Sequence, residues 1–327
     1  MNYDGREAPP WIYPNHVLIT KLASSEFGRL FFLENLEHNY IALNRFKSGD
    51  KLLVLIGAYF DQWNFEYAKK CFVYQNPGFD LKSIYWLANT PAQAQMVLDL
   101  GFNVLEFNQN SFIDEYTFQI QDEPKIYQLV MNARPENVKR PWLAMKVAHI
   151  AAIKGKLFSP NNFWDLGQLH PDYLNQERIP LDEVVRILNQ SYVGGIFSEK
   201  EGACFASSEY LLCGLPVVST ICSGGREIWY NDYNSIIVEP DEYAIAQAVE
   251  LLANKVKEKQ IDPYQIREHH IALSLIQRDR LHTLLNEFIE SMRLQMHSKQ
   301  IYQKILRDWS TVHQVENVDR DLFDENT

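Results

Sequence analysis

Short β-rich runs alternate with helical stretches along most of this chain, and this alternation constrains the fold more than any other feature. It is typical of βαβ units, in which helices connect parallel strands. One unit is well marked, because Pro91 opens an expected helix and Gly101 stands just past its end. In the first half we expect strands at residues 16–20, 40–43, 51–57, 83–87 and 103–107.

The second half repeats the pattern. Helices are expected at 140–153, 181–190, 207–212 and 242–253, and strands at 126–131, 156–158, 194–197, 216–220 and 235–238. After Pro263 the pattern is helical to about residue 312, and the acidic residues 316–327 are expected to fray. The polar stretch 109–124 lacks periodicity, so the domain boundary is placed there.

Length, charge and cysteine usage narrow the class of protein. A chain of 327 residues suggests two domains at roughly 150 residues each. A formal net charge of −11 argues against a nucleic-acid-binding surface. The longest apolar stretch, near residues 52–60, is too short to span a bilayer, and residues 1–10 lack the order of a signal peptide, so we expect a cytoplasmic protein without stable membrane insertion. The widely spaced Cys71, Cys204, Cys213 and Cys222 are expected to be buried thiols.

The segment 198–220 is the most informative. An expected strand ends at Glu201 and Gly202, a loop of small residues follows, and a helix begins near Phe205. This arrangement presents backbone N–H groups at the carboxyl edge of a parallel sheet, where phosphates and nucleotides bind. Glu201 and Glu209 bracket the loop, and a carboxylate that accepts from two vicinal hydroxyls suits a sugar or ribose ring.

Four ordered motifs resemble one family. Glu201 and Glu209 stand eight positions apart, and Gly-Leu-Pro-Val-Val at 214–218, Gly-Gly-Arg-Glu at 224–227 and an apolar run ending in Pro240-Asp241 follow. The order is similar to that of retaining nucleotide-sugar glycosyltransferases of GT-B fold with a Glu-x7-Glu motif, the group 1 or family 4-like enzymes. The resemblance implies an α/β protein of two Rossmann-like domains with parallel sheets that face each other across a cleft, with a helical C-terminal extension.

Arg134 and Lys139 follow the expected strand 126–131 with the spacing of the two cations that bind the diphosphate in this family. A leaving nucleoside diphosphate gains negative charge, which a guanidinium and an ammonium stabilise. The family's glycine before the arginine is Ala133 here. Arg140 is interpreted as a solvated residue at a helix start, and Arg226 as an exposed or Glu-paired side chain.

The resemblance assigns the remaining roles. Arg134, Lys139 and Glu201 would act in catalysis, Glu201 through the donor sugar's hydroxyls, and Glu209 would hold the ribose. The backbone of the loop and of the glycine turn would face the sugar or the diphosphate. The residues of these two segments are Gly202, Ala203, Cys204, Phe205, Gly224 and Gly225.

The resemblance covers the first domain only near its end, at residues 86–118. The expected domains are a shortened acceptor-side domain at 1–120, a nucleotide-sugar-binding domain at 121–290 and a C-terminal helix and tail at 291–327. Gly57 is at most a vestige of the family's glycine-rich loop. His16 and His38 are the candidates for the histidine that often lies near the reacting sugar in this family, but both are interpreted as structural or surface residues. Core packing is the favoured explanation of the aromatic residues after the strand at 51–57, although they could stack on a sugar; they are Tyr59, Phe60, Trp63, Phe65 and Tyr67.

The resemblance implies a retaining hexosyltransferase-like enzyme. It would transfer a sugar from a UDP- or GDP-sugar to a hydroxyl of a saccharide, lipid or small-molecule acceptor. No Asp-x-Asp element stands at a strand end, and the histidines do not have the spacing of metal ligands. We therefore expect no metal ion and no cofactor beyond the donor. No side chain offers itself as a base, which favours the front-face route that the resemblance to this family implies. Two alternatives stay open: a nucleotide-sugar epimerase or hydrolase on the same fold, and a non-catalytic partner subunit of a glycosyltransferase complex.

Overall fold

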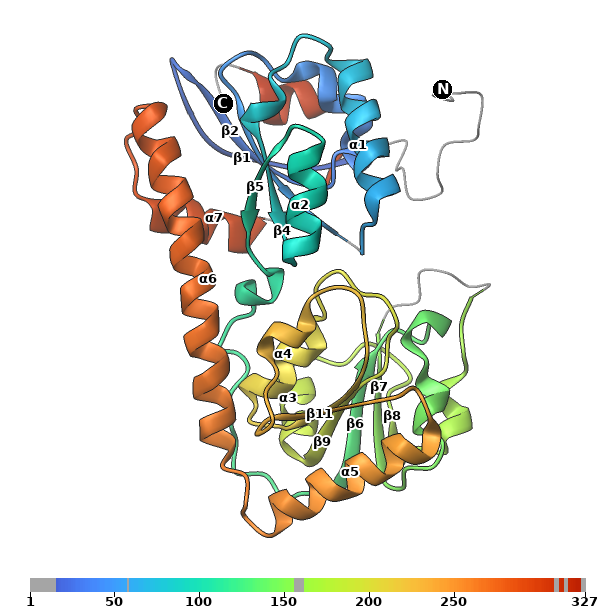
Figure 1. The fold of residues 1–327 in the computed structure, drawn as a ribbon. Helices are drawn as coiled ribbons and strands as arrows, with labels where there is room; N and C mark the ends of the chain where they lie inside the picture. The colour runs from blue at the N-terminus through green and yellow to red at the C-terminus, as the bar shows by residue number, and fades with distance from the viewer. Residues whose placement is uncertain (1–15, 58, 156–161, 309–311, 315–316, 325–327) are drawn as a thin grey trace. The chain divides into compact units, whose positions relative to one another are not determined.

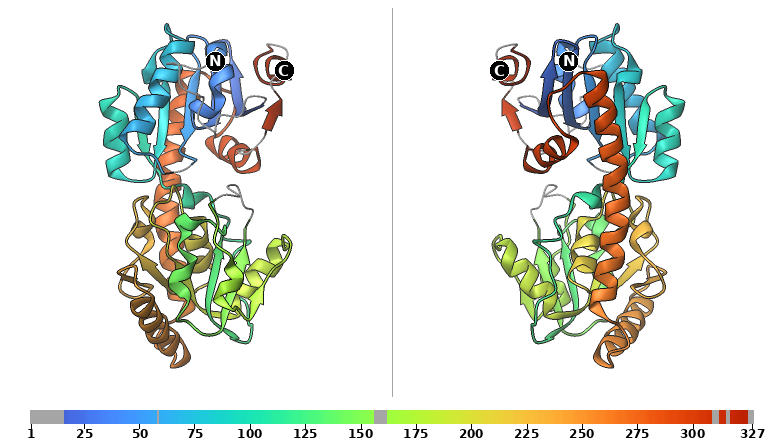
Figure 2. Two further views of the ribbon diagram at one scale, coloured as in Figure 1. Left: turned by 90° about the vertical axis from the view of Figure 1, so that its right-hand side faces the viewer. Right: turned by 90° about the vertical axis from the view of Figure 1, so that its left-hand side faces the viewer.

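The computed structural model describes residues 16–57, 59–155, 162–308, 312–314 and 317–324 (Figures 1 and 2). The chain divides into two compact units, unit 1 with Met1–Ser111 and Ile276–Thr327, and unit 2 with Phe112–Leu275. The sequence placed the boundary near residue 120 and set residues 291–327 apart. In the structure the division between the units falls within the long helix α6 (Pro263–Ser291), after Leu275. The residues from Ile276 to the C-terminus belong to unit 1.

Unit 1 is built on a sheet with the strand order β12-β1-β2-β3-β4-β5. Strands β1 (His16–Ser25) and β2 (Gly28–Glu34) form an antiparallel hairpin. Strands β3 (Lys51–Leu55), β4 (Ile84–Ala88) and β5 (Asn103–Glu106) then continue parallel to β2. β12 (Val312–Gln314) closes the other edge by pairing antiparallel with β1. The sequence did not predict β2, β12 or their pairing with β1.

Two helices connect the parallel strands of unit 1, α1 (Gln62–Gln75) and α2 (Pro91–Asp99). The predicted unit around α2 is confirmed: the Thr90 hydroxyl accepts from the Gln93 N–H, and Gly101 ends the segment at a φ of +90°. The core is rich in aromatic side chains, among them the fully buried Phe31, Phe65, Phe72, Trp86 and Phe102.

Two expectations for unit 1 are wrong. Residues 40–43 lie in a 3₁₀ segment, Glu37–Arg45, because the buried Asn39 side chain accepts from the Leu18 N–H and donates to the carbonyl of Glu34, which holds the chain in a turn. The C-terminal tail is not frayed over residues 317–324. Its apolar side chains enter the core, where Phe323 contacts Phe31 at a ring distance of 5.3 Å.

Unit 2 contains an all-parallel sheet in the order β11-β10-β9-β6-β7-β8. Its α-helices are α3 (Leu181–Asn189), α4 (Phe205–Leu212), α5 (Glu242–Lys257) and the part of α6 up to Leu275. β10 is buried along its whole length, as expected of a strand covered on both faces. The strands are β6 (Tyr127–Ala133), β7 (Ile150–Lys154), β8 (Tyr173–Leu174), β9 (Ser191–Ile196), β10 (Val217–Thr220) and β11 (Ser235–Val238).

The helix predicted at 140–153 does not form. Arg140 and His149 adopt left-handed backbone conformations, at φ values of 48° and 52°, which end a helix on either side. A short 3₁₀ turn, Pro141–Ala144, precedes β7, whose buried apolar residues pair with β6 instead. The strand predicted at 156–158 lies outside the described residues.

The predicted helical C-terminal region is present as α6 and α7 (Ser298–Asp308). Among the described helices, none is long and apolar enough to cross a membrane.

Candidate functional site

The candidate site lies at the carboxyl edge of the sheet of unit 2. The strand order reverses between β6 and β9, which are neighbours although they are far apart in sequence. In open parallel sheets, ligands bind outside the carboxyl ends of the strands at such a reversal. The segment after β6 carries Arg134 and Lys139, and the segment after β9 carries Glu201, so the topology places these three predicted residues on the two sides of the reversal.

Lys139 and Glu201 contact each other directly. Lys139 Nζ lies 2.5 Å from Glu201 Oε1, and both side chains are largely buried, at 15% and 10% exposure. The Ser198 hydroxyl donates to the same carboxylate oxygen at 2.6 Å. Breaking this ion pair would leave a buried charge without a partner, which costs free energy. The ion pair therefore holds both side chains in defined orientations.

Arg134 is more accessible than Lys139. Its side chain is 39% exposed, and Nη1 lies 3.5 Å from Glu136 Oε1. The guanidinium stem packs beside β7: a Cβ added at Gly155 would lie 3.3 Å from Arg134 Cγ. The Arg134 guanidinium is therefore accessible to solvent at this edge of the sheet, where an anion can reach it.

The glycine turn is folded against the Glu201 loop. Glu201 N–H donates to the carbonyl of Ser223, and Ser223 N–H donates to the carbonyl of Glu199. Gly224 has a φ of +149°, and a Cβ added there would lie 2.1 Å from the Glu201 carbonyl oxygen. Gly225 also has a positive φ, of 87°. The two glycines thus permit a close backbone approach at the position where the sequence predicted ligand contact.

Arg226 is buried, which contradicts the expectation of an exposed side chain. It is 1% exposed and donates to the Ser198 hydroxyl at 2.7 Å and to the carbonyl of Thr220 at 2.7 Å. Its ion pair with Glu227 is long, at 4.0 Å. Arg226 therefore ties together the ends of β9 and β10, and through Ser198 it faces the Glu201 carboxylate.

Arg140 is likewise not a solvated residue at a helix start. Its Nε donates to the carbonyl of Phe197 at 2.6 Å and its Nη2 to the hydroxyl of Thr220 at 2.8 Å. Burial lowers the pKa of this guanidinium. Arg140 and Arg226 thus both join the ends of β9 and β10, whereas Lys139 contacts the Glu201 carboxylate directly.

Glu209 lies on α4 and is hydrogen-bonded to the end of β6. Its Oε2 accepts from the Asn132 side-chain amide at 2.7 Å, and the neighbouring Tyr210 hydroxyl accepts from the Asn132 backbone N–H at 2.6 Å. Burial raises the pKa of Glu209 to about 7, although the Asn132 hydrogen bond opposes the rise. The sequence did not predict this role of Asn132, since the two residues meet only in the folded sheet.

The predicted loop connects Glu201 to α4. Gly202 and Cys204 are buried, while Ala203 and Phe205 are half-buried. Cys204 is the N-cap of α4, and its side chain makes no capping hydrogen bond. Burial raises the pKa of the Cys204 thiol to about 12, so this cysteine is an unreactive packing residue at neutral pH. The expectation of buried thiols holds for Cys71, Cys204 and Cys213, whereas Cys222 is half-buried; all four are free.

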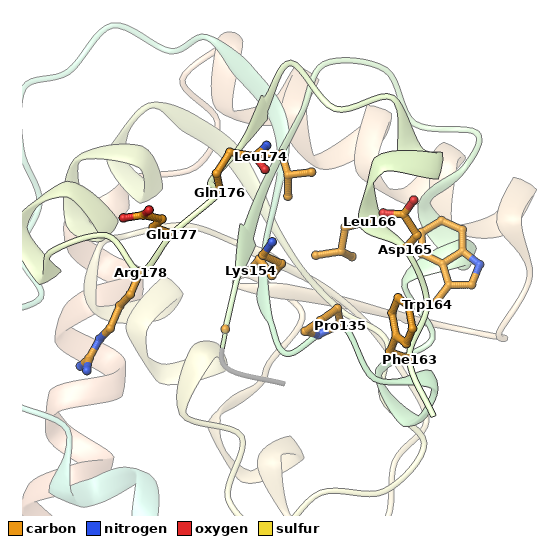
Figure 3. A pocket seen from close by; sticks show the side chains of 11 residues that line it. Pro135, Lys154, Phe163, Trp164, Asp165, Leu166, Leu174, Gln176, Glu177 and Arg178 are labelled. Atoms are coloured by element: carbon orange, nitrogen blue, oxygen red, sulfur yellow. The ribbon is translucent and has the colours of Figure 1, made fainter. Parts of the chain in front are cut away.

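A pocket that the sequence did not predict adjoins Arg134. Its volume is about 730 Å³, and it opens at the carboxyl ends of β6, β7 and β8 (Figure 3). Pro135, Gly155 and Leu174 line it at the ends of β6, β7 and β8, and Trp164 lines it from the segment between β7 and β8. The volume lies within the range of small-molecule sites. The sequence did not signal this pocket, because most of β7 was expected to be helical and β8 was not expected.

Within the described residues, no group of three or more His, Cys, Asp or Glu side chains could hold a metal ion. His16 has no described side chain, and His38 lies in unit 1, half-buried beside Asn35, at 3.4 Å between Nδ1 and the amide nitrogen. The five aromatic residues after β3 differ from one another: Phe60 and Phe65 are core residues, whereas Trp63 is 52% exposed.

Solved structures share this fold, whereas no family model and no curated protein matches the sequence. TarM has 15% identity over 73% of this chain and 50% of TarM, with a TM-score of 0.51. Anabaena HepE, solved in complex with UDP, has 12% identity over 79% of this chain and 71% of HepE, also at 0.51. The pneumococcal O-GlcNAc transferase GtfA, solved with UDP and GlcNAc, has 14% identity over 80% of this chain and 56% of GtfA, at 0.54.

These similarities confirm the predicted GT-B class of α/β fold, with two sheet-containing units. At identities below 25% they bear on the fold alone. The chain spans about half the length of TarM, so part of that protein has no counterpart in the compared region.

Proposed function

We propose that this chain is a retaining glycosyltransferase that uses a nucleotide-diphosphate sugar, a UDP- or GDP-sugar, as donor. The observation that carries the proposal is the arrangement at the reversal between β6 and β9, where Lys139 pairs with Glu201, Arg134 directly follows β6, and Glu209 lies one helix turn into α4. HepE and GtfA, which share the fold, were solved with UDP, and this supports the choice of ligand class.

In the proposed complex the diphosphate lies against Arg134 and Lys139. Lys139 would exchange part of its contact with Glu201 for a phosphate oxygen, since one ammonium offers three donors. Glu201, still held by the Ser198 hydroxyl, would then accept from hydroxyls of the donor sugar. Glu209 would accept from the two ribose hydroxyls, which requires its ionised form. The pocket beside Arg134 is large enough to hold the base.

The proposed reaction breaks the bond between the sugar's anomeric carbon and the β-phosphate oxygen, and forms a bond from the acceptor hydroxyl oxygen to the same face of that carbon. The acceptor proton goes to the departing phosphate. Charge on this leaving group increases during the step, and Arg134 and Lys139 stabilise it without rearranging. Because these cations neutralise the diphosphate, the proposed reaction needs no metal ion.

Product analysis tests this function. The protein is incubated with UDP- or GDP-hexoses, with and without saccharide and lipid-linked acceptors, and the products are identified by mass spectrometry and NMR. The proposal expects a glycoside with the donor's anomeric configuration, formed only with acceptor. An isomerised nucleotide sugar, or free sugar formed equally well without acceptor, would instead indicate the epimerase or hydrolase.

A further inference from the structure

The carboxyl edge of the sheet in unit 1 carries a carboxylate with no hydrogen-bonding partner among the described residues. Glu34 is the last residue of β2, and its side chain is half-buried. Its carboxylate makes no hydrogen bond or ion pair within residues 16–57, 59–155, 162–308, 312–314 and 317–324. A Cβ added at Gly57, just after β3, would lie 2.3 Å from Glu34 Oε1, so the glycine leaves room for this carboxylate at the edge.

Glu37, three residues later, is a second acid beside it. It is 3% exposed, and its Oε2 atom has no hydrogen-bond partner in the described part of the chain. Burial raises the pKa of Glu37 to about 8, and the charge of Glu34 adds to the rise. At neutral pH Glu37 is therefore largely protonated. Burial also raises the pKa of Glu34 above its ordinary value. The Asn35 side chain accepts from the Gly57 N–H at 2.9 Å and fixes the two strand ends against each other.

The helix α1 begins a few residues after the end of β3 (Figure 1), and its first turns carry an aromatic pair, the exposed Trp63 and the half-buried Tyr67. Trp63 is 52% exposed and stacks on Tyr67, with ring centroids 5.4 Å apart and an interplanar angle of 11°. Tyr67 lies close enough to Glu37 for the two groups to interact electrostatically. An indole ring held flat against a second ring and open to solvent is a preformed stacking surface.

The described residues that directly follow the four parallel strands of unit 1 contain no lysine or arginine. They are residues 35–38 after β2, 56–57 after β3, 89–90 after β4 and 107–110 after β5. Acids, amides, a histidine and the Thr90 hydroxyl supply the polar side chains there. A phosphate-bearing ligand would meet a carboxylate without a counter-cation at these positions, which is unfavourable.

We propose that this edge of unit 1 binds a neutral saccharide as the acceptor, with the apolar C–H face of a sugar ring on Trp63 and its hydroxyls donating to Glu34. The assignment of the saccharide as acceptor rests on the proposed function. The binding chemistry itself does not, because an aromatic face and a carboxylate acceptor at one sheet edge suit a neutral polyol whatever reaction follows. Trp63 is connected to Glu34 through Tyr67 and Glu37, which interact in turn.

Calorimetric titration of the full chain tests the proposal, with and without UDP. The neutral probes are methyl hexosides and neutral disaccharides, and the anionic probes are glycerol 1-phosphate and farnesyl phosphate. At least one neutral probe is expected to bind. Trp63→Ala should weaken that binding about tenfold, near the upper end for one aromatic contact, whereas Trp63→Phe should keep it within about threefold. Glu34→Gln should weaken it without affecting UDP.

Tyr74→Ala is the matched control, because Tyr74 is 62% exposed on the last turn of the same helix. It should leave saccharide binding unchanged, and thermal melting should show that all variants fold. The proposal is overturned if no neutral probe binds, if Trp63→Ala binds like the wild type, or if only the anionic probes bind. Saccharide binding that depends on Trp63, in a protein that binds no nucleotide diphosphate, would support this proposal and refute the proposed function.

Discussion

The affinity for a nucleotide sugar should depend on pH through Glu209. Burial raises the pKa of this carboxyl to about 7 in the free protein. If the carboxylate accepts from two ribose hydroxyls, only the ionised form binds well, so the apparent dissociation constant rises as the free protein becomes protonated. The factor is 1 + 10^(pKa − pH), which is about 11 at pH 6 and about 1.1 at pH 8. Affinity should therefore be about tenfold higher at pH 8 than at pH 6.

The assay is calorimetric titration at pH 6, 7 and 8 and constant ionic strength, with the UDP- or GDP-sugar that binds most tightly. An intact nucleotide sugar is preferable to the free diphosphate, because a terminal phosphate itself titrates near pH 6. Binding at pH 7 should release about half a proton, measured by repeating the titration in buffers of different ionisation enthalpy.

Glu209→Gln is the control. It keeps one oxygen acceptor and removes the titrating group, so its weaker binding should be nearly independent of pH. An affinity that is equal at pH 6 and pH 8 in the wild type, or a pH profile that persists in Glu209→Gln, would refute the assignment of Glu209 to the ribose.

Three further predictions concern two contacts in unit 2 and the need for a metal ion. Gly224→Ala should lower the free energy of unfolding by at least about 2 kcal/mol in urea titrations, because its Cβ would clash with the Glu201 carbonyl oxygen; Gly78→Ala, where nothing lies within 4 Å, should be close to neutral. Ser198→Ala removes the hydroxyl between Arg226 and Glu201 and should lower the free energy of unfolding by about 1–3 kcal/mol. A melting curve equal to that of the wild type would show that the Ser198 hydroxyl does not contribute to holding Arg226 and Glu201. Turnover should survive EDTA, and a loss that manganese restores would contradict the metal-independent mechanism.

The elements that the sequence predicted correctly are those with local signals. The strand at 235–238 is a compact apolar run, and α2 has its proline and glycine in place. The failures came where distant contacts override the local pattern. Residues 140–153 look helical, but Arg140 is held in a left-handed conformation, where its side chain reaches the ends of β9 and β10.

The same limit applies to the site. The spacing of Glu201 and Glu209 is local and could be read from the sequence, as could that of Arg134 and Lys139. The ion pair between Lys139 and Glu201 joins residues 62 positions apart and depends on β6 and β9 being neighbours. The burial of Arg226 depends on carbonyl groups and hydroxyls that only converge when the strands pair.

The exposure of Trp63 beside the buried Phe65 depends on which face of α1 meets the sheet. The apolar content of the segment did not distinguish the two aromatic residues, because both belong to the same aromatic run. Their separation into a core residue and a surface residue is a property of the packed helix.

The most direct test of the central claim is donor binding at the edge of unit 2. Calorimetry with UDP- and GDP-sugars is carried out on the wild type, on Arg134→Ala and on Arg320→Ala, a control in unit 1 whose side chain is 69% exposed. One donor should bind to the wild type and to Arg320→Ala with equal affinity. Arg134→Ala should bind it more weakly and, in a turnover assay, react on the order of a hundredfold more slowly. Failure of every nucleotide sugar to bind, or unchanged binding and turnover in Arg134→Ala, would contradict the account.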